Sequence, residues 1–361
     1  MARLLIDALG KAGHRVEIAS RFRSYDGAGD PARQDRLRQI GEKLAERLIR
    51  RYRKRPAAER PEAWFTYHLY HKAPDWLGPA VCKALDIPYL VAEASFAPKR
   101  AAGPWATGHE AVAAALPRAD AVFELNAADG ECILPLLKAP EVLVPLPPFL
   151  DAAPYFAAAG NRDRHRAALA GALGIETDVP WILAVAMMRP GDKLASYRVL
   201  AEALHTLHDR PWRLIVIGTG PARGDVEIVL RPLAGRTQFL GAVGQADLPA
   251  VYAACDIFAW PAVNEAYGMA LLEAQASGLP VVASDTGGVG GIVSHEESGL
   301  LTDRAEPAPI AAALASLLDD PARRTELGRN ALHKVSLRHT VDAAATRLQT
   351  VIASLGKKVR I

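Results

Sequence analysis

Cysteine, long apolar runs and net charge are scarce in this chain, and each scarcity narrows the class of protein. Its three cysteines, Cys82, Cys132 and Cys255, lie far apart in apolar sequence, which offers neither a metal-ligand spacing nor a disulfide framework. No run of eighteen apolar residues and no signal-peptide pattern is present, so we expect a cytoplasmic protein that does not span a membrane. The net charge is only +3, and it is unevenly distributed.

The positive charge is concentrated in one segment, Arg33–Arg60. It contains eleven Lys or Arg against four Asp or Glu, and Leu37, Ile40, Leu44 and Leu48 recur within it at helical spacing. This pattern predicts a basic amphipathic helix. Two interpretations stay open, a solvated surface face or peripheral contact with an anionic membrane at its inner face. Nucleic acid is not expected as a partner, because no aromatic interleaving or known binding motif accompanies the charge.

Length and apolar patterning predict two α/β domains. A chain of 361 residues, half of them hydrophobic, supplies enough apolar material for two cores. The first half alternates short apolar strands with helical segments, as an α/β fold requires. A helix is expected over Ala2–Gly13, and the expected strands are Arg15–Ser20, Trp64–Tyr67, Tyr89–Ala92 and Ala121–Leu125. Leu143–Pro148 is a short Pro-rich exit, and a second sheet is expected to begin at Trp181.

The most informative segment is the run from Asn264 to Val282. It places Glu265 and Glu273 eight residues apart around a small Gly-containing turn, and continues through a helix to Gly-x-Pro and a short apolar strand. The apolar stretch Asp256–Pro261 before it is typical of a buried parallel strand. The acidic turn is therefore expected at the carboxyl end of a strand, where open parallel sheets bind ligands.

The chemistry of this turn fits a nucleotide sugar. If the helix starts near Tyr267, its free amide groups and positive dipole end form a cradle for phosphate oxygens, and Gly268 permits close approach. Because carboxylates repel phosphate, Glu265 and Glu273 are better placed to accept hydrogen bonds from hydroxyls on either side of a diphosphate. For an isolated pair of glutamates, an ordinary amphipathic helix with two solvated carboxylates is the more common explanation.

The wider sequence context favours the ligand site, because six segments in order resemble the family 4 glycosyltransferases. These are retaining enzymes with the GT-B fold, in which two Rossmann-like domains face each other across a cleft. The stretch Glu265 to Glu273 matches the family's E-x7-E motif. The other matching segments are Trp181–Ala186, Leu214–Pro221, Val243–Asp256, Val281–Gly288 and Ser298–Leu301.

The resemblance implies a division of the chain. Residues 1–155 would form an acceptor-side Rossmann-like domain, residues 156–335 the donor-binding Rossmann-like domain, and residues 336–361 a helix that crosses back to the first domain. The family opens with a strand and a Gly-rich loop, whereas this chain opens with the helical segment Ala2–Gly13. We therefore expect the first strand and its loop, which faces the donor diphosphate in the family, to be missing.

The resemblance also assigns roles at the donor site. Glu273 would bind the ribose hydroxyls and Glu265 the hydroxyls of the donor sugar, while Lys193 and Arg189 would stabilise the departing diphosphate. No cofactor and no metal is expected, since the helix terminus and the cations replace a divalent ion. The remaining donor-binding candidates are Ala266, Tyr267 and Met269 together with Gly268 for phosphate, and Gly218, Thr219 and Gly220 near the nucleotide.

Two departures from the family pattern concern catalysis. The family carries Gly-Arg before a loop that ends in Lys. Here Lys193 keeps its place, but Met187 occupies the Arg position and Arg189 is the candidate substitute. The family also has a His after the strand that corresponds to Tyr89–Ala92, and this chain has none there. The candidate replacements on the acceptor side are His68, His71, Glu93, Ser95 and His109.

We interpret the chain as a retaining hexosyltransferase that uses a nucleoside diphosphate sugar and an unidentified hydroxyl acceptor. One alternative is a noncatalytic nucleotide-sugar-binding protein of the same fold, which Met187 and the missing acceptor-side His favour. A nucleotide-sugar epimerase is a second alternative, although the acid-base residues that it needs are not found.

Overall fold

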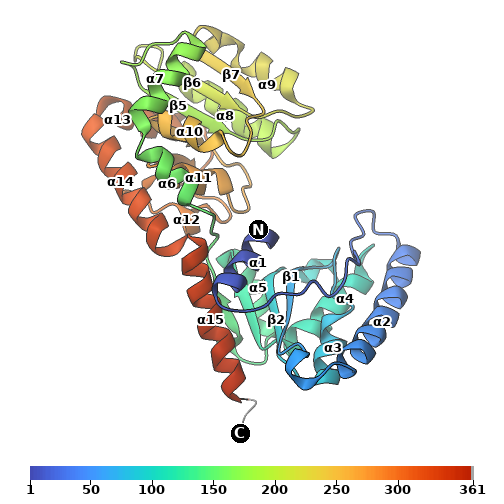
Figure 1. The fold of residues 1–361 in the computed structure, drawn as a ribbon. Coiled ribbons are helices and arrows are strands. Elements are labelled where there is room, and N and C mark those ends of the chain that lie inside the picture. The colour runs from blue at the N-terminus through green and yellow to red at the C-terminus, as the bar shows by residue number, and fades with distance from the viewer. Residues whose placement is uncertain (359–361) are drawn as a thin grey trace. The chain divides into compact units, whose positions relative to one another are not determined.

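A computed structural model describes residues 1–358, which divide into two compact units. The first unit combines Ala2–Pro147 with the C-terminal segment that begins at Ala344, and the second unit consists of Pro148–Ala343 (Figure 1). Each unit contains one sheet of parallel strands with helices packed against it, which confirms the predicted α/β class.

The first unit is built on a four-stranded parallel sheet with the order β1-β2-β3-β4. The strands are β1 Trp64–Leu69, β2 Tyr89–Ala94, β3 Ala121–Glu124 and β4 Leu143–Pro145. Three of them confirm strands expected from the sequence, and β4 lies in the segment expected to be a Pro-rich exit. Strand β2 is buried almost throughout, because helices cover both faces of a parallel sheet.

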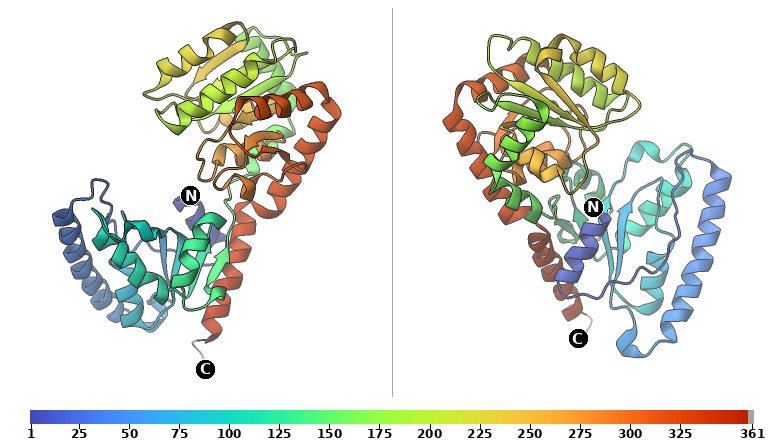
Figure 2. Two further views of the ribbon diagram at one scale, coloured as in Figure 1. Left: turned by 180° about the vertical axis from the view of Figure 1, so that it is seen from behind. Right: turned by 45° about the horizontal axis from the view of Figure 1, so that its top comes forward.

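The first and the last helix of the chain, α1 and α15, both belong to the first unit. Helix α15 returns to lie beside α1 (Figures 1 and 2), and residues of both helices line the same cavity. The side chain of Leu348 in α15 is fully buried, and Arg347 Nε donates to Pro145 O at 2.8 Å. The helices are α1 Ala2–Lys11, α2 Pro31–Arg53, α3 Gly78–Leu85, α4 Ala106–Ala115, α5 Ala127–Ile133 and α15 Val341–Lys358.

The expected strand Arg15–Ser20 is not formed. The chain from Glu17 to Asp26 runs alongside β1, since Glu17 pairs with Arg55 ahead of that strand and Asp26 N donates to Lys72 O beyond it. Within residues 1–358, however, β1 is an edge strand that pairs only with β2. A cavity of about 1690 Å³ is lined by both β1 and this segment. The prediction was wrong because a strand needs a ladder of backbone hydrogen bonds, and this segment forms no such ladder with β1.

Helix α2 is the predicted basic helix, but its buried face differs from the predicted one. Its most buried positions include Gly41, Ala45 and Leu48, whereas Ile40 is 41% exposed. Gly41 lies so close to the Trp76 side chain that any larger residue would collide with it. The buried face of α2 thus includes small residues that allow close packing. A pattern of large apolar side chains does not reveal such a face.

Several cations of α2 have partners within the first unit. Arg51 and the following Arg55 both pair with Glu17, at 3.0 and 2.8 Å, and Arg38 pairs with Asp35. No helix among the described residues is long and apolar enough to cross a membrane. Contact of α2 with an anionic membrane stays a prediction, which vesicle sedimentation at low and high salt would test.

The second unit contains a six-stranded parallel sheet with the order β10-β9-β8-β5-β6-β7. The chain builds one half outward from β5 and then returns to build the other half outward from β8. The strand order therefore reverses between β5 and β8, and open α/β sheets bind ligands at such a switch point. The strands are β5 Trp181–Val185, β6 Arg213–Ile217, β7 Thr237–Gly241, β8 Ile257–Trp260, β9 Val281–Ser284 and β10 Gly299–Thr302.

Helices cover both faces of this sheet (Figures 1 and 2), so its central strands are apolar in sequence and buried. The strand expected to begin at Trp181 is confirmed. The helices are α6 Ala153–Ala159, α7 Arg162–Leu173, α8 Asp192–His205, α9 Arg223–Leu230, α10 Leu248–Ala254, α11 Met269–Ala276, α12 Val289–Ile292, α13 Pro307–Asp319 and α14 Pro321–Arg338.

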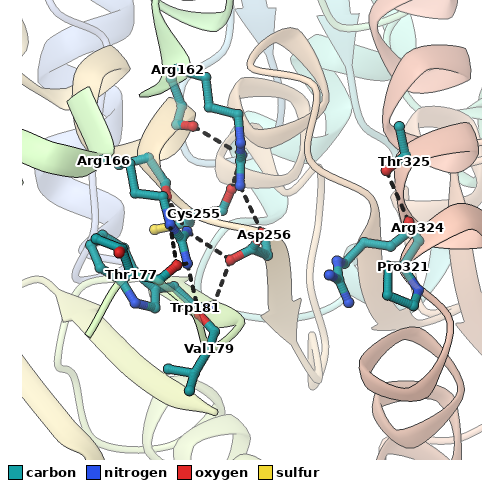
Figure 3. Close-up of polar contacts among 12 residues, drawn as sticks. Arg162, Arg166, Thr177, Val179, Trp181, Cys255, Asp256, Pro321, Arg324 and Thr325 are labelled. Atoms are coloured by element: carbon teal, nitrogen blue, oxygen red, sulfur yellow. Dashed lines mark hydrogen bonds and ion pairs between the residues drawn. The ribbon is translucent and has the colours of Figure 1, made fainter. Parts of the chain in front are cut away.

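One carboxylate joins the two central strands to a helix. Asp256, directly before β8, pairs with Arg162 and Arg166 of α7 at 2.7 and 2.8 Å (Figure 3). It also accepts a hydrogen bond from the backbone N of Trp181, the first residue of β5, at 2.7 Å. The guanidinium of Arg166 lies 4.2 Å from the centre of the Trp181 ring. This cluster fixes β5 and β8 at their amino ends.

We predict that Asp256→Ala strongly destabilises the second unit, because it leaves the largely buried Arg166 and the partly exposed Arg162 without their counterion. Breaking such a pair costs about 3 kcal/mol, which is a fall in Tm of roughly 6–12 °C for a unit of this size. The control is Asp319→Ala, which breaks an exposed bidentate pair with Arg210 in the same unit. Calorimetry should show a much smaller shift for the control. Equal shifts would contradict the role of the Asp256 cluster.

Candidate functional site

The turn between β8 and α11 lies at the carboxyl end of a central strand, as the sequence predicted. Two of its non-glycine residues, Ala262 and Asn264, have positive φ angles of 60° and 49°. Residues in this region of backbone space are strained unless the surrounding structure holds them, and such strain collects at functional sites. The strained turn is therefore a candidate ligand site in the second unit.

Neighbouring loops hold this strained turn in place. Asn264 Nδ2 donates to Asp192 Oδ1 at 3.0 Å, and the backbone N of Val263 donates to Ser196 Oγ at 3.1 Å, so the start of α8 supports it from one side. On the other side, Thr286 Oγ1 donates to the carbonyl of Ala262. A Cβ at Gly287 would collide with the carbonyl of Glu265, so only glycine allows this approach.

Helix α11 begins at Met269, two residues later than the sequence suggested. Gly268 adopts a left-handed conformation with φ 69°, which ends the turn and prevents the helix from extending back to Tyr267. The carbonyl of Gly268 already accepts from the amide groups of Leu271 and Leu272. Of the predicted phosphate donors, Gly268 and Met269 stand at the helix start, while Ala266 and Tyr267 belong to the turn before it.

Glu265 and Lys193 form an ion pair, a contact between residues 72 positions apart. Lys193 is the second residue of α8, and its ammonium lies 5.5 Å from the centre of the Trp260 ring. Trp260 Nε1 donates to the same carboxylate oxygen of Glu265 at 3.2 Å. The structure thus brings the strongest cationic candidate and one of the two acidic candidates together beside the end of β8.

Arg189 is not part of this arrangement in the structure. Its side chain is exposed, and one guanidinium nitrogen lies 3.1 Å from the sulfur of Met187, which is itself 53% exposed. Gly218 and Gly220 have a packing role, and their contact with the nucleotide stays a prediction. A Cβ at either position would collide with the carbonyls of Ala186 or Met188, so these glycines let the loop after β6 pack on the loop after β5.

Thr219, between the two glycines, takes part in the same packing. Its carbonyl accepts a hydrogen bond from the backbone N of Met188 at 3.0 Å. The loops after β5 and β6 are therefore fixed next to each other at the carboxyl ends of neighbouring strands. This is the position expected of a nucleotide-binding loop in an open sheet.

Glu273, one turn into α11, is partly buried beside two tyrosines. Tyr252 of α10 donates to Glu273 Oε2 at 2.9 Å, and the hydroxyl of Tyr155 of α6 lies near this carboxylate. Burial raises the pKa of Glu273, and both hydroxyls oppose that shift. Reasoning from the sequence missed both tyrosines, because they are 21 and 118 residues away from Glu273 and carry no motif of their own.

The first unit gathers three of the acceptor-side candidates at the carboxyl ends of β1 and β2. His68 and Glu93 both have positive φ, at 65° and 59°. The hydroxyl of Tyr67 lies near Glu93, and Ser95 lies near Asp129 of α5. Burial raises the pKa of Asp129, and the nearby Glu93 raises it further. Asp129 was missed, although it follows β3 by five residues and the rule of strand ends would have found it.

The other two candidates, His71 and His109, lie against aromatic rings. His71 is in edge contact with Trp105, with ring centres 5.7 Å apart, and His109 packs on Phe96 at 4.3 Å. The Nε2 atoms of both histidines are buried and have no hydrogen-bond partner among residues 1–358. Burial lowers the pKa of His71, and the nearby cations Arg100 and Lys72 add to this effect.

A search for metal sites finds no candidate in the part of the chain that the structure describes. No group of three or more His, Cys, Asp or Glu side chains is arranged there to hold a metal ion. The predicted functional residues gather in three clusters, which are Lys193 with Glu265, Glu273 with its tyrosines, and the Glu93–Asp129 group.

Residues 179–320 match the model of a family described as glycosyl transferases group 1. The match covers β5 to β10 and includes Lys193, Glu265 and Glu273. It confirms the resemblance on which the sequence interpretation of the second unit rests.

Curated proteins similar to this chain include the D-inositol 3-phosphate glycosyltransferase of Corynebacterium diphtheriae. It is 38% identical over 161 residues, which are 43% of this chain and 37% of that protein. The matches to the first curated relatives span less than half of those proteins' length.

Solved structures resemble the chain over more of its length. A glycosyltransferase from Rickettsia africae aligns with a TM-score of 0.70 at 17% identity, over 98% of this chain and 88% of that one. The Anabaena protein Alr3699/HepE, solved in complex with UDP and glucose, gives a TM-score of 0.64 at 20% identity, over 86% of this chain and 81% of that one. At these identities the likeness shows the fold.

Proposed function

We propose that this protein is a retaining glycosyltransferase that moves a sugar from a nucleoside diphosphate sugar to a hydroxyl acceptor. The observation that carries the proposal is the arrangement at the carboxyl ends of β5 and β8. A cation, Lys193, and two carboxylates, Glu265 and Glu273, flank the start of α11 at the switch point of a domain that matches the group 1 glycosyltransferase family. The likeness to a protein solved with UDP and glucose supports this choice of donor class.

Each group has a role that follows from its charge and surroundings. The phosphates of the donor carry the negative charge that Lys193 and the amides at the start of α11 are suited to bind. Glu273 and Glu265 accept hydrogen bonds from hydroxyls, Glu273 from the ribose and Glu265 from the sugar. Because Lys193 is already paired with Glu265, the diphosphate must compete for the ammonium as it binds. The leaving group is stabilised without a metal ion or cofactor.

The acceptor side is assigned to the Glu93–Asp129 group of the first unit. Its carboxylates, with the Tyr67 hydroxyl and Ser95, offer several hydrogen-bond partners to a polyhydroxylated acceptor. His68 lies on the same strand ends. The identity of the acceptor is not implied by these groups.

A noncatalytic nucleotide-sugar-binding protein is the second candidate. Met187 favours it, because this apolar residue stands where the family carries an arginine, and Arg189 contacts the Met187 sulfur rather than Glu265 or Lys193. Both candidates bind the donor, so binding and turnover must be measured separately.

Nucleotide binding tests the proposal most simply. We predict that the wild type binds UDP or GDP and that Glu273→Gln weakens binding about 10- to 150-fold, because a hydrogen bond with a charged partner contributes roughly 1.5–3 kcal/mol. Titration calorimetry makes the measurement, with Glu227→Gln as control, since Glu227 is exposed and paired with Arg223. Equal affinity of wild type and Glu273→Gln for every nucleotide would remove Glu273 from the site.

Turnover separates the two candidates. We predict that Lys193→Ala lowers the rate of UDP release from the donor about 100-fold or more, with a smaller loss of donor affinity, because its charge acts mainly on the developing negative charge. Arg189→Ala should have the smaller effect on rate. A larger loss with Arg189→Ala would invert the assignment, and a wild type that binds the donor without any turnover would support the noncatalytic candidate.

A further inference from the structure

We propose that Tyr252 and Tyr155 are positioning residues that make the donor site select nucleotides with both ribose hydroxyls. The inference rests on the proposed function, in which Glu273 binds the ribose. It concerns two side chains that do not themselves touch the nucleotide and act through the carboxylate of Glu273.

Packing fixes the position of both phenol groups. Tyr252 is fully buried, and its ring stacks on Phe258 of β8 with centres 5.9 Å apart. The ring of Tyr155 meets that of Tyr252 edge-on, also at 5.9 Å. Tyr252 comes from α10 and Tyr155 from α6, so two helices and a central strand hold the hydroxyls. A carboxylate that is bound by the fixed Tyr252 hydroxyl, with the fixed Tyr155 hydroxyl beside it, has little freedom to rotate.

The number of hydrogen-bond acceptor sites on Glu273 limits which nucleotides the site can bind well. An ionised carboxylate has about four lone-pair sites for hydrogen bonds. Tyr252 occupies one of them and the Tyr155 hydroxyl lies beside the same carboxylate, so two sites remain for a ligand. A ribose offers two neighbouring hydroxyls as donors, which matches the remaining capacity. A nucleotide that lacks one hydroxyl leaves a buried acceptor unsatisfied, and a site of this kind discriminates strongly against such analogues.

Both tyrosines can act only as donors to the carboxylate. Burial, together with the charge of Glu273, raises the pKa of Tyr252 and of Tyr155 well above the usual value, so neither phenol ionises near neutral pH. Asp151 adds to the shift at Tyr155 and Cys255 to that at Tyr252. The phenols therefore keep the protons with which they orient Glu273. Because burial raises the pKa of Glu273, these hydroxyls also help to keep its carboxylate ionised.

The test compares ribonucleotides with deoxynucleotides. Affinities of wild type, Tyr252→Phe and Tyr155→Phe are measured by titration calorimetry for whichever of UDP, GDP and ADP binds, and for its 2′-deoxy and 3′-deoxy analogues. We expect the wild type to prefer the ribonucleotide and each variant to lower this preference about fivefold, since one orienting hydroxyl is lost. Tyr197→Phe is the control, because Tyr197 is equally buried but donates to the carbonyl of Ala186.

The outcomes distinguish this inference from the function on which it rests. If the wild type binds none of the three nucleotides, the proposed function fails and this inference fails with it. If it binds one, and both Phe variants keep the wild-type preference for the ribonucleotide, only the role of the tyrosines is overturned. A loss of affinity that is equal for ribo- and deoxynucleotides would also overturn it, because that result indicates a structural effect. Thermal melting shows whether each variant is folded. If Tyr252→Phe is not folded, Tyr155→Phe alone provides the test.

Discussion

The ion pairs of Asp256 hold together the two strands between which the strand order reverses. Asp256 ties α7 to the start of β8 through Arg162 and Arg166, and it also caps the first backbone amide of β5. All of these contacts lie at the amino ends of the strands, opposite the predicted site. The residues at the carboxyl ends of β5 and β8 are therefore free to serve a ligand site, because other contacts hold the two strands together.

At those carboxyl ends the protein keeps charge of both signs in close contact. Lys193 and Glu265 neutralise each other beside Trp260, and this pairing limits the cost of holding each charge in a partly buried place. In the proposed function a diphosphate takes over the ammonium, and Glu265 turns to the hydroxyls of the sugar. Glu273 is treated differently, because neutral phenols rather than a cation support it. The two glutamates of one motif thus sit in two different environments, as two different roles require.

The sequence alone predicted the parts of this structure that are encoded locally. The apolar runs of β1, β2, β3 and β5 and the acidic turn after β8 were found from patterns of a few residues. Its failures have physical causes. The segment Arg15–Ser20 has the pattern of a strand but forms no hydrogen-bond ladder with β1, and the start of α11 is set by the left-handed backbone of Gly268. The tyrosines around Glu273 were invisible because only the fold brings them there.

The central claim is that a nucleoside diphosphate binds at the carboxyl ends of β5 and β8. A crystal structure of the protein with UDP, or with the diphosphate that binds most tightly, tests it most directly. The account predicts ribose hydroxyls at the Glu273 carboxylate, with phosphate oxygens at Lys193 Nζ and at the amide of Met269, and the contact between Lys193 and Glu265 broken or shared. A nucleotide bound elsewhere, or bound with its phosphates away from Lys193 and the contact with Glu265 intact, would contradict it.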